Sequence, residues 1–294
     1  MVIITSISQI LTYSFGIFDV TKIFYTITTR EFKYSFIADF LPLPRIQATY
    51  LEPSMLSPFL IGFYSMYLYN MINKRILEIK YLFIFVILFV ITLFTTSTTA
   101  YVSLLLITLI ILFYANTFSL IRSNIVVKLN LIRNLLYITL TLIMFFFIVS
   151  FVLNLNDIFK IIELYLFKKQ NTQSFYSRTT ADIHAIKLFQ ETYFMGVGLG
   201  SNRPSSLLPY LLSQLGILGS LLFFFFIFKL LIFTYRTLRK SSFFGYFFLI
   251  PSVLIVQIIA YPDITNPTLW QFIYVSIIIA TSLYKGKNEH EHLH

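Results

Sequence analysis

The residues of this chain that could do chemistry gather between positions 178 and 219, where a polar segment passes through alternating glycines into a long apolar run. Glycine lets the backbone adopt positive φ and approach another surface closely, and donor side chains follow these glycines. Such a sequence predicts a loop that holds an anion. The candidate residues for binding that anion are Gly196, Gly198, Gly200, Ser201, Asn202, Arg203 and Ser206.

Arg203 gives the anion-binding interpretation its main support. It precedes Pro204 at a predicted helix start, where unpaired N–H groups and the positive end of the helix dipole favour an anion. The guanidinium fork can also donate two parallel hydrogen bonds to a diphosphate. The alternatives are an arginine that snorkels to lipid headgroups and a glycine segment that is only a flexible loop. Position 201 is serine and no strand precedes the glycines, which excludes a dinucleotide-binding fingerprint.

Two further candidates lie upstream of the glycines, in a segment with a helical pattern. Arg178 is predicted to open this helix, with Thr179 and Thr180 as its caps, and Asp182 follows one turn later. Both charged side chains are candidates for catalysis. The simpler alternative is an exposed Arg–Asp pair, which contributes little to stability.

Three other titratable side chains are candidates for catalysis or substrate binding. His184 shares a predicted helix face with Lys187 and Glu191, which is typical of a solvated surface, although an imidazole can also act as a general base. Arg45 and Glu52 lie in a proline-rich loop ahead of an apolar run. Turn formation and topology explain these two charges equally well, but charges beside a membrane are costly enough to suggest a function.

The composition excludes a soluble globular protein. Of the 294 residues, 57% are hydrophobic and only 12% are charged, and the mean hydropathy is +0.81. Unbroken apolar runs favour membrane-spanning helices over a barrel. The net charge of +10 is explained by basic cytoplasmic loops, so no nucleic-acid partner is predicted. The chain has no cysteine, which excludes a thiol nucleophile and a thiolate metal site.

We therefore predict an all-α, polytopic transmembrane bundle of about eight spans that forms a single integral membrane domain over residues 1–294. The charge bias of the loops places both termini in the cytoplasm, and it places the polar segments 19–54 and 154–206 outside. The second of these segments, between spans five and six, is the larger and includes interfacial helices. The predicted spans are 1–18, 55–72, 81–97, 99–115, 134–153, 207–233, 243–261 and a last span that ends near residue 284.

Details of the last three spans bear on the site. Gly216 and Gly219 have a spacing that would let a neighbouring helix approach the sixth span closely. Lys229 is expected near the inner end of this span, where it can snorkel. The chain ends in HEHLH, which matches the H-E-x-x-H zinc motif, but these residues follow the solvated run KGKNE and form a predicted disordered cytoplasmic tail, 285–294. No metal or other cofactor is predicted.

Three sequence blocks resemble the O-antigen polymerase and O-antigen ligase family of integral membrane enzymes. They occur in the family's order and cover about a third of the chain. The blocks are RIQATYLEPSMLSPFL, LFTTSTTAYVSLLL and SRTTADIHAIKLFQETYFMGVGLGSNRPSSLLPYLLSQLGILG. The third block is the most specific. By this resemblance Arg178 matches the arginine of the large outer loop, and Arg203 matches the polar position after the glycines, where ligases often have histidine. The arginine therefore favours polymerase over ligase.

The resemblance implies transfer of a growing glycan from a polyprenyl diphosphate to another lipid-linked repeat unit, at the outer face of a bacterial cytoplasmic membrane. Arg178 and Arg203 would bind the leaving diphosphate, and Arg45 the second lipid-linked substrate. Deprotonation of the acceptor hydroxyl would fall to His184 or to a carboxylate. The carboxylate candidates are Glu52, Asp182 and Asp263, the last of which is also assigned to substrate binding.

The expected partners are polyprenyl-diphosphate-linked oligosaccharides, membrane lipids, a chain-length regulator and a flippase. Two other functions remain open, as does a third possibility, a non-catalytic scaffold left by truncation. One is ligase-like transfer of the glycan to a different acceptor. The other is transport of lipid-linked sugars, which predicts a charge near the middle of the membrane, and Lys229 is the one candidate for that charge.

Overall fold

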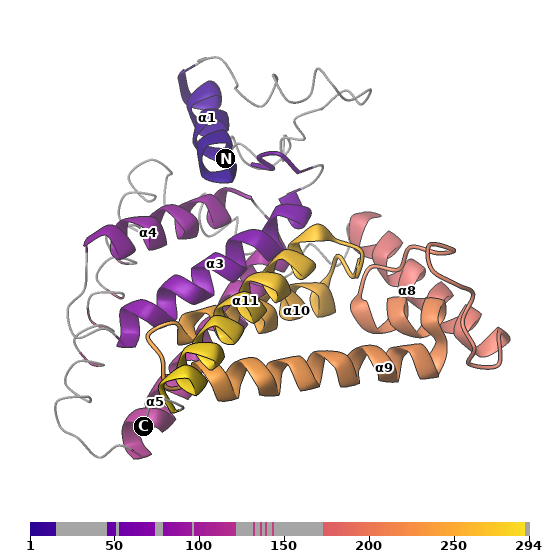
Figure 1. Ribbon diagram of the computed structural model, residues 1–294. Helices are drawn as coiled ribbons and strands as arrows, with labels where there is room; N and C mark the ends of the chain where they lie inside the picture. The colour runs from indigo at the N-terminus through magenta and orange to yellow at the C-terminus, as the bar shows by residue number, and fades with distance from the viewer. Residues whose placement is uncertain are drawn as a thin grey trace. The chain divides into compact units, whose positions relative to one another are not determined.

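The computed structural model describes residues 1–15, 46–50, 53–73, 79–95, 97–121, 132, 136, 139, 143 and 173–291. This described part of the chain is helical and contains no strand, as the sequence predicted (Figure 1). Contacts between residues divide the chain into two compact units, Met1–Gln170 and Asn171–His294. The candidate site residues from position 178 onward all belong to the second unit.

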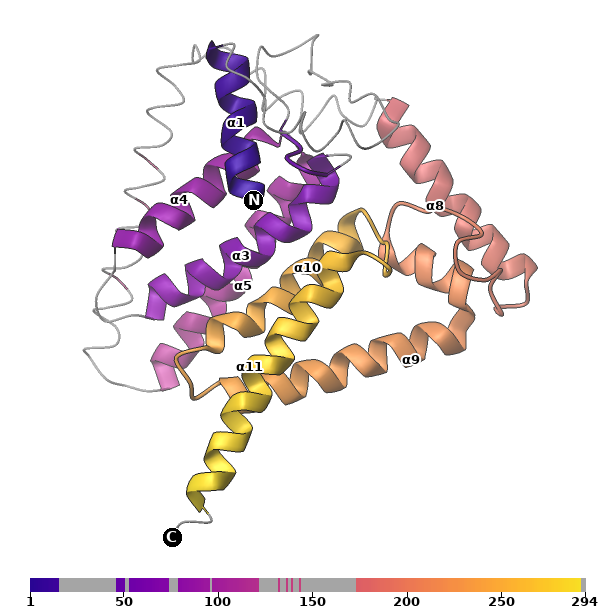
Figure 2. The same ribbon diagram turned by 45° about the horizontal axis from the view of Figure 1, so that its top comes forward.

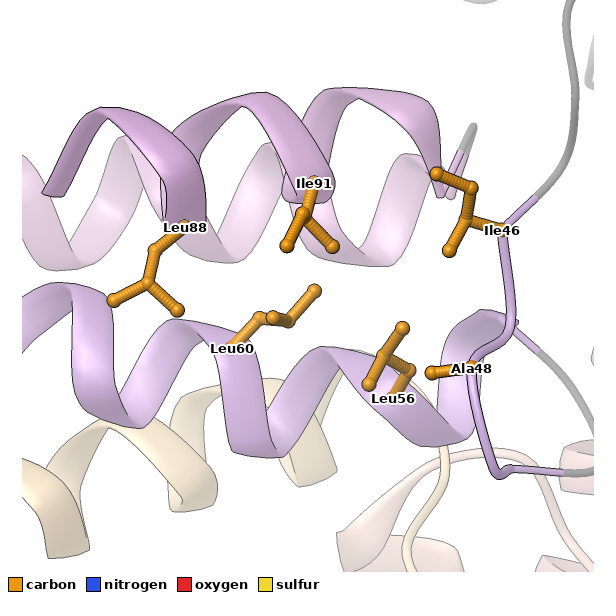
Figure 3. Packing of buried hydrophobic residues seen from close by; sticks show 6 residues of the cluster. All are labelled: Ile46, Ala48, Leu56, Leu60, Leu88 and Ile91. Atoms are coloured by element: carbon orange, nitrogen blue, oxygen red, sulfur yellow. The ribbon is translucent and has the colours of Figure 1, made fainter. Parts of the chain in front are cut away.

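The first unit packs around helix α3 (Pro53–Asn73), which contacts both α4 (Ile79–Phe94) and α5 (Thr98–Ile121), while α1 (Val2–Phe15) contacts α4. Leucine and isoleucine side chains of α3 and α4 point toward one another, and the segment 46–48 closes one end of this core (Figure 3). The core residues are Ile46, Ala48, Leu56, Leu60, Leu88 and Ile91.

A buried glutamine holds the closing segment in place. The side chain of Gln9 is 4% exposed, and its Oε1 accepts hydrogen bonds from the backbone N–H groups of Gln47 and Ala48, at 3.2 and 3.0 Å. The N–H of Ile46 donates to the carbonyl of Phe94 at 3.0 Å. An irregular segment without these partners would leave buried backbone groups unpaired, so α1 is part of what orders the chain ahead of α3.

The second unit contains the long helix α9 (Leu207–Leu238), and α8 (Gln173–Glu191) packs against it. After α9 the chain passes through the 3-10 helix η3 (Phe244–Phe248) into α10 (Leu249–Ile259) and returns along α11 (Pro267–Glu291), which contacts both α10 and α9 (Figure 2). The last helix reaches Glu291, so the predicted disorder is wrong for 285–291. No proline follows Tyr284, and lysine and glutamate are good helix formers, so the helix continues through Gly286.

Three helices of the described residues are long and apolar enough to cross a membrane. They are α5 over Thr98–Ala115, α9 over Leu207–Leu238 and α11 over Pro267–Tyr284. Shorter apolar helical stretches occur at Val2–Thr12, Ile79–Phe94 and Phe244–Ile259. All of the predicted span 134–153 except residues 136, 139 and 143, most of the polar segment 19–54, and residues 154–172 of the second polar segment lie outside the described residues, so the total of eight spans stays a prediction.

Helix α9 is bent at Gly216, whose φ of 66° and ψ of −173° are not helical. The bend divides α9 into a short arm, 207–215, and a long arm, 217–238. At 1.5 Å per residue the long arm measures about 33 Å, which matches the hydrocarbon core of a bilayer, about 30 Å thick. The long arm alone is therefore sufficient for a span, and the short arm is free to form part of the site.

Candidate functional site

The glycine loop has the backbone conformation that the sequence predicted. Gly196, Gly198 and Gly200 have φ values of 81°, 93° and 83°, a region that residues with a side chain rarely occupy. The three glycines are not equivalent in their surroundings. A Cβ atom on Gly200 would have no neighbour within 4 Å, and one on Gly198 would meet only Ser201 Oγ at 3.7 Å. One side of the loop is thus open to a ligand.

The opposite side of the loop binds the bend in α9. In a straight helix the Ile217 N–H would donate to the Ser213 carbonyl, and the bend at Gly216 separates these two groups. The loop replaces both partners, since Val197 N–H donates to Ser213 O at 2.7 Å and Ile217 N–H donates to Phe194 O at 3.0 Å. Gly198 N–H adds a third bond, to the carbonyl of Gln214, at 3.0 Å.

Gly196 and Gly216 permit this contact because neither has a side chain. A Cβ atom on Gly196 would lie 2.5 Å from the backbone nitrogen of Gly216, and a Cβ on Gly216 would collide with the carbonyl of Met195. The predicted role of Gly216 in helix–helix approach is therefore wrong, because the partner is a loop of the same unit. A Cβ on Gly219 would meet the Leu215 side chain of its own helix, at 2.6 Å.

The carboxylate of Asp182, a residue of α8, caps the N-terminus of α9. Its Oδ1 accepts the backbone N–H groups of Ser205 and Ser206 at 2.6 and 3.2 Å, and its Oδ2 accepts the hydroxyl of Ser206 at 2.7 Å. The prediction that these N–H groups are free to bind a ligand is therefore wrong. The anion that the helix terminus attracts is the carboxylate of the protein itself, and Ser206 serves this internal contact.

The helix that contains Arg178 begins earlier than predicted, so Thr179 and Thr180 do not cap it. The helix begins at Gln173, so Arg178 lies inside it, and the hydroxyls of Thr179 and Thr180 donate to carbonyls of the preceding turn, at 3.0 and 2.9 Å, instead of capping the helix. Propensity favours threonine at caps, but the polar residues ahead of Arg178 extend the helix by more than one turn. The Arg178 carbonyl accepts the Ser205 hydroxyl at 2.9 Å, which brings this turn of α8 beside the chain that follows Arg203.

The two arginines keep their guanidinium groups available. Arg178 is half-buried and Arg203 is exposed. Over residues 173–291, neither guanidinium makes a hydrogen bond or an ion pair with the protein, and Asp182 is bound to serines instead of to Arg178. Ser205 joins the two segments through the Arg178 carbonyl, so these guanidinium groups belong to adjoining parts of the chain and are available to an anionic ligand.

Gln214, which was not among the residues predicted from the sequence, is the side chain that orders the end of the glycine loop. This glutamine is 2% exposed, its Oε1 accepts the Gly200 N–H at 2.8 Å, and its Nε2 donates to the Asn202 carbonyl at 2.7 Å. Asn202 Oδ1 accepts the Ser213 hydroxyl at 3.2 Å, and Ser201 Oγ donates to Val197 O at 2.9 Å. Asn202 and Ser201 thus use polar atoms inside the loop. The sequence signal that could have identified Gln214 is the polar pair Ser213–Gln214 within an otherwise apolar run.

The segment between α10 and α11 joins the same site. Tyr261 N–H donates to the carbonyl of Ser205 at 3.0 Å. The carboxylate of Asp263 accepts the backbone N–H and the hydroxyl of Thr265, at 2.8 and 2.5 Å, and therefore fixes the turn ahead of α11. Gln257, which is fully buried, donates to the carbonyl of Asp263 at 3.0 Å. Asp263, the candidate for substrate binding, follows a segment that is bonded to the α9 N-terminus, and its carboxylate is engaged in its own turn.

The remaining candidates divide between the surface and the residues outside the described ranges. His184, Lys187 and Glu191 are exposed on α8, as predicted for a solvated face. Arg45 and Glu52 lie outside the described residues.

The position of Lys229 differs from prediction, because α9 continues for more than two turns beyond it, to Leu238. The ammonium group lies over the Phe225 ring, 5.3 Å from its centroid.

The site in the second unit therefore consists of two unpaired arginines, a rigid glycine loop with one open side, and a helix terminus that an internal carboxylate already caps. Comparison of the chain with protein-family models, with curated proteins and with solved structures finds no match.

Proposed function

We propose that this protein is a membrane-embedded polymerase that joins lipid-linked oligosaccharide repeat units into a surface polysaccharide. In the proposed reaction, the acceptor hydroxyl of one repeat unit attacks the anomeric carbon of a glycan held on a polyprenyl diphosphate. The glycosidic bond forms, the bond to the diphosphate breaks, and the hydroxyl proton passes to a base. The reaction takes place at the outer face of the bacterial cytoplasmic membrane, in a bundle of about eight spans with both termini inside.

The observation that carries this proposal is the pair of guanidinium groups, on Arg178 and Arg203, that have no hydrogen-bond or ion-pair partner among residues 173–291. A diphosphate leaving group develops negative charge as its bond to the sugar breaks, so cations that bind it more strongly in the transition state accelerate the reaction. Arg178 and Arg203 supply such cations on two segments that Asp182 and the serines hold together. The open side of Gly198 and Gly200 leaves room for a phosphate, while the N–H groups of both glycines already donate to Gln214, so the binding energy would come from the arginines.

The contacts also divide the roles among the carboxylates. Asp182 accepts the hydrogen bonds of two serines at the α9 N-terminus, so we assign it as a positioning residue that fixes α8 to α9. Asp263 fixes the adjoining turn in the same way. His184 is exposed and has no protein partner within residues 173–291, and it remains the candidate base in this unit, with Glu52 of the first unit as the other.

Deletion of the gene in the source bacterium, followed by analysis of its surface glycan, tests this function. A polymerase deletion leaves single repeat units attached to their lipid or core acceptor. Loss of a flippase leaves undecorated lipid-linked intermediates inside the cell, and loss of a ligase leaves polymer on the polyprenyl carrier. A surface glycan of unchanged length in the deletion strain refutes the proposal. Complementation with the wild-type gene is the control that attributes the change to this protein.

A further inference from the structure

The segment between α8 and the glycine loop exposes four large apolar side chains, which we call the loop patch. Tyr193 is 85% exposed, Phe194 53%, Met195 75% and Leu199 58%. Soluble surfaces expose single apolar residues routinely, but four on one loop of seven residues mark an interaction surface.

The exposed conformation is fixed by the backbone and does not arise from a mobile loop. Tyr193 and Phe194 have φ values of 52° and 67°, which cost free energy for aromatic residues and persist only where surrounding contacts hold them. Those contacts are present, since Phe194 N–H donates to Phe189 O at 2.9 Å and Phe194 O accepts the Ile217 N–H at 3.0 Å. The Thr192 hydroxyl also accepts the Gly196 N–H at 3.1 Å. The loop cannot turn its apolar side chains inward without losing these bonds.

The loop patch continues the apolar surface of a candidate membrane span. Phe194 is bonded to Ile217, the first residue of the long arm of α9. The first turns of that arm expose further apolar side chains, which are Ile217 at 50%, Leu218 at 69%, Leu221 at 60% and Leu222 at 69%. Lipid that covers this face of the long arm meets the loop patch at the point where the span ends.

The composition of the loop patch fits the boundary between hydrocarbon and headgroups. Tyrosine is enriched at that depth, because its aromatic body can enter the acyl chains while its hydroxyl stays hydrated, and phenylalanine, methionine and leucine add apolar surface beside it. The flanking charges of Glu191 and Arg203 are exposed and stand at the two ends of the loop, where they can remain in the headgroup layer. The backbone N–H groups of Gly196, Val197 and Gly198 are already bonded within the protein, so apolar surroundings leave them no unpaired donor.

We propose that residues 193–199 insert into the interfacial layer of the bilayer at this end of α9, with membrane lipid as the occupant of the loop patch. The insertion anchors the glycine loop at a fixed depth, next to the membrane end of α9. This inference does not depend on the reaction proposed above, because it rests on exposure and on continuity with the span.

Single-cysteine labelling in vesicles tests the insertion directly, since the native chain has no cysteine. The full-length variants Met195→Cys and Leu199→Cys are labelled with an environment-sensitive nitrobenzoxadiazole fluorophore. They are reconstituted at low protein-to-lipid ratio into phosphatidylcholine–phosphatidylglycerol vesicles. Fluorescence is quenched either by phosphatidylcholine with a nitroxide on acyl carbon 5 or by iodide present on both sides of the membrane. Leu222→Cys on the long arm and Lys187→Cys on α8 are the matched controls for lipid and for water.

We expect positions 195 and 199 to behave like position 222, with emission at short wavelength, strong quenching by the lipid nitroxide and weak quenching by iodide, while position 187 shows the opposite pattern. Strong iodide quenching at 195 and 199 overturns the proposal. Protection from both quenchers also overturns it, because the occupant is then protein. Failure of the lipid nitroxide to quench position 222 removes the premise that the long arm spans the membrane, and the proposal with it. None of these outcomes bears on whether the protein polymerises glycans.

Discussion

Replacement of Gly216 by alanine is the most direct test of the reciprocal contact between the glycine loop and the bend in α9. The native φ of 66° and ψ of −173° lie in a region that only glycine occupies readily, and a Cβ there collides with the carbonyl of Met195. Strain of about 1 to 3 kcal/mol, added to two lost hydrogen bonds of about 0.5 to 1.5 kcal/mol each, gives a destabilisation of about 2 to 6 kcal/mol. That is a large share of the stability of an ordinary domain.

The variant has one way to avoid the strain. If α9 straightens, the hydrogen bond between Ser213 and Ile217 forms within the helix, and the loop loses both partners. We therefore expect Gly216→Ala to lower the thermal unfolding temperature in detergent and to accelerate hydrogen exchange across residues 192–203. Exchange in the second half of the long arm should stay close to that of the wild type, because its helical hydrogen bonds do not involve the bend.

Gly200→Ala is the matched control, because it also replaces a glycine of positive φ but has no atom within 4 Å of the added Cβ. Its cost is limited to the strain of the left-handed region, about 1 to 2 kcal/mol. If Gly216→Ala unfolds at the wild-type temperature with a protected loop, or if both variants lose the same stability, the argument that the loop and the bend require each other is refuted.

Three further predictions concern the proposed reaction and the topology. The Arg178→Lys and Arg203→Lys variants should insert into the membrane normally but polymerise purified lipid-linked repeats roughly 10- to 1000-fold more slowly. This loss corresponds to about 1.4 to 4 kcal/mol of transition-state stabilisation and is expected because lysine lacks the bidentate fork of arginine. Near wild-type activity of both variants would contradict a diphosphate clamp. The Asp182→Ala variant should lose the cap of α9 and about 1 to 3 kcal/mol of stability, whereas Asp182→Asn should lose less stability. Unfolding temperatures of both variants equal to that of the wild type would show that the carboxylate is dispensable. An impermeant thiol reagent on intact cells should label Gln173→Cys and not Asn124→Cys, and the reverse pattern would invert the topology.

Local features of the second unit could be predicted from the sequence. Alternating glycines require positive φ in almost any fold that orders them, and the apolar run after Ser206 is long enough that its helical state and its start were evident. The same reasoning located the tight turn between α4 and α5, because a run of serine and threonine between two apolar segments leaves few alternatives. In the structure α4 ends at Phe94 and α5 begins at Thr98.

Features that depend on distant partners were not predictable in the same way. The partner of the α9 N-terminus is Asp182, 24 positions before Ser206, and no local pattern relates the two. Gly216 looked like a helix-packing residue because the residues on both sides of it are strong helix formers. The bend is favourable only because the loop supplies partners for the broken helical hydrogen bonds. That loop precedes the short arm in the sequence, whereas the bend follows the short arm.

The exchange of hydrogen bonds between the loop and α9 also sets an order of events during synthesis. The ribosome makes residues 192–203 before it makes Ser213, Gln214 and Ile217, which complete their backbone hydrogen bonds. Until Ile217 has been made, the carbonyl of Phe194 lacks the donor that it has in the folded unit. The glycine loop can therefore reach its folded conformation only after the bend of α9 and the first residue of the long arm have been synthesised.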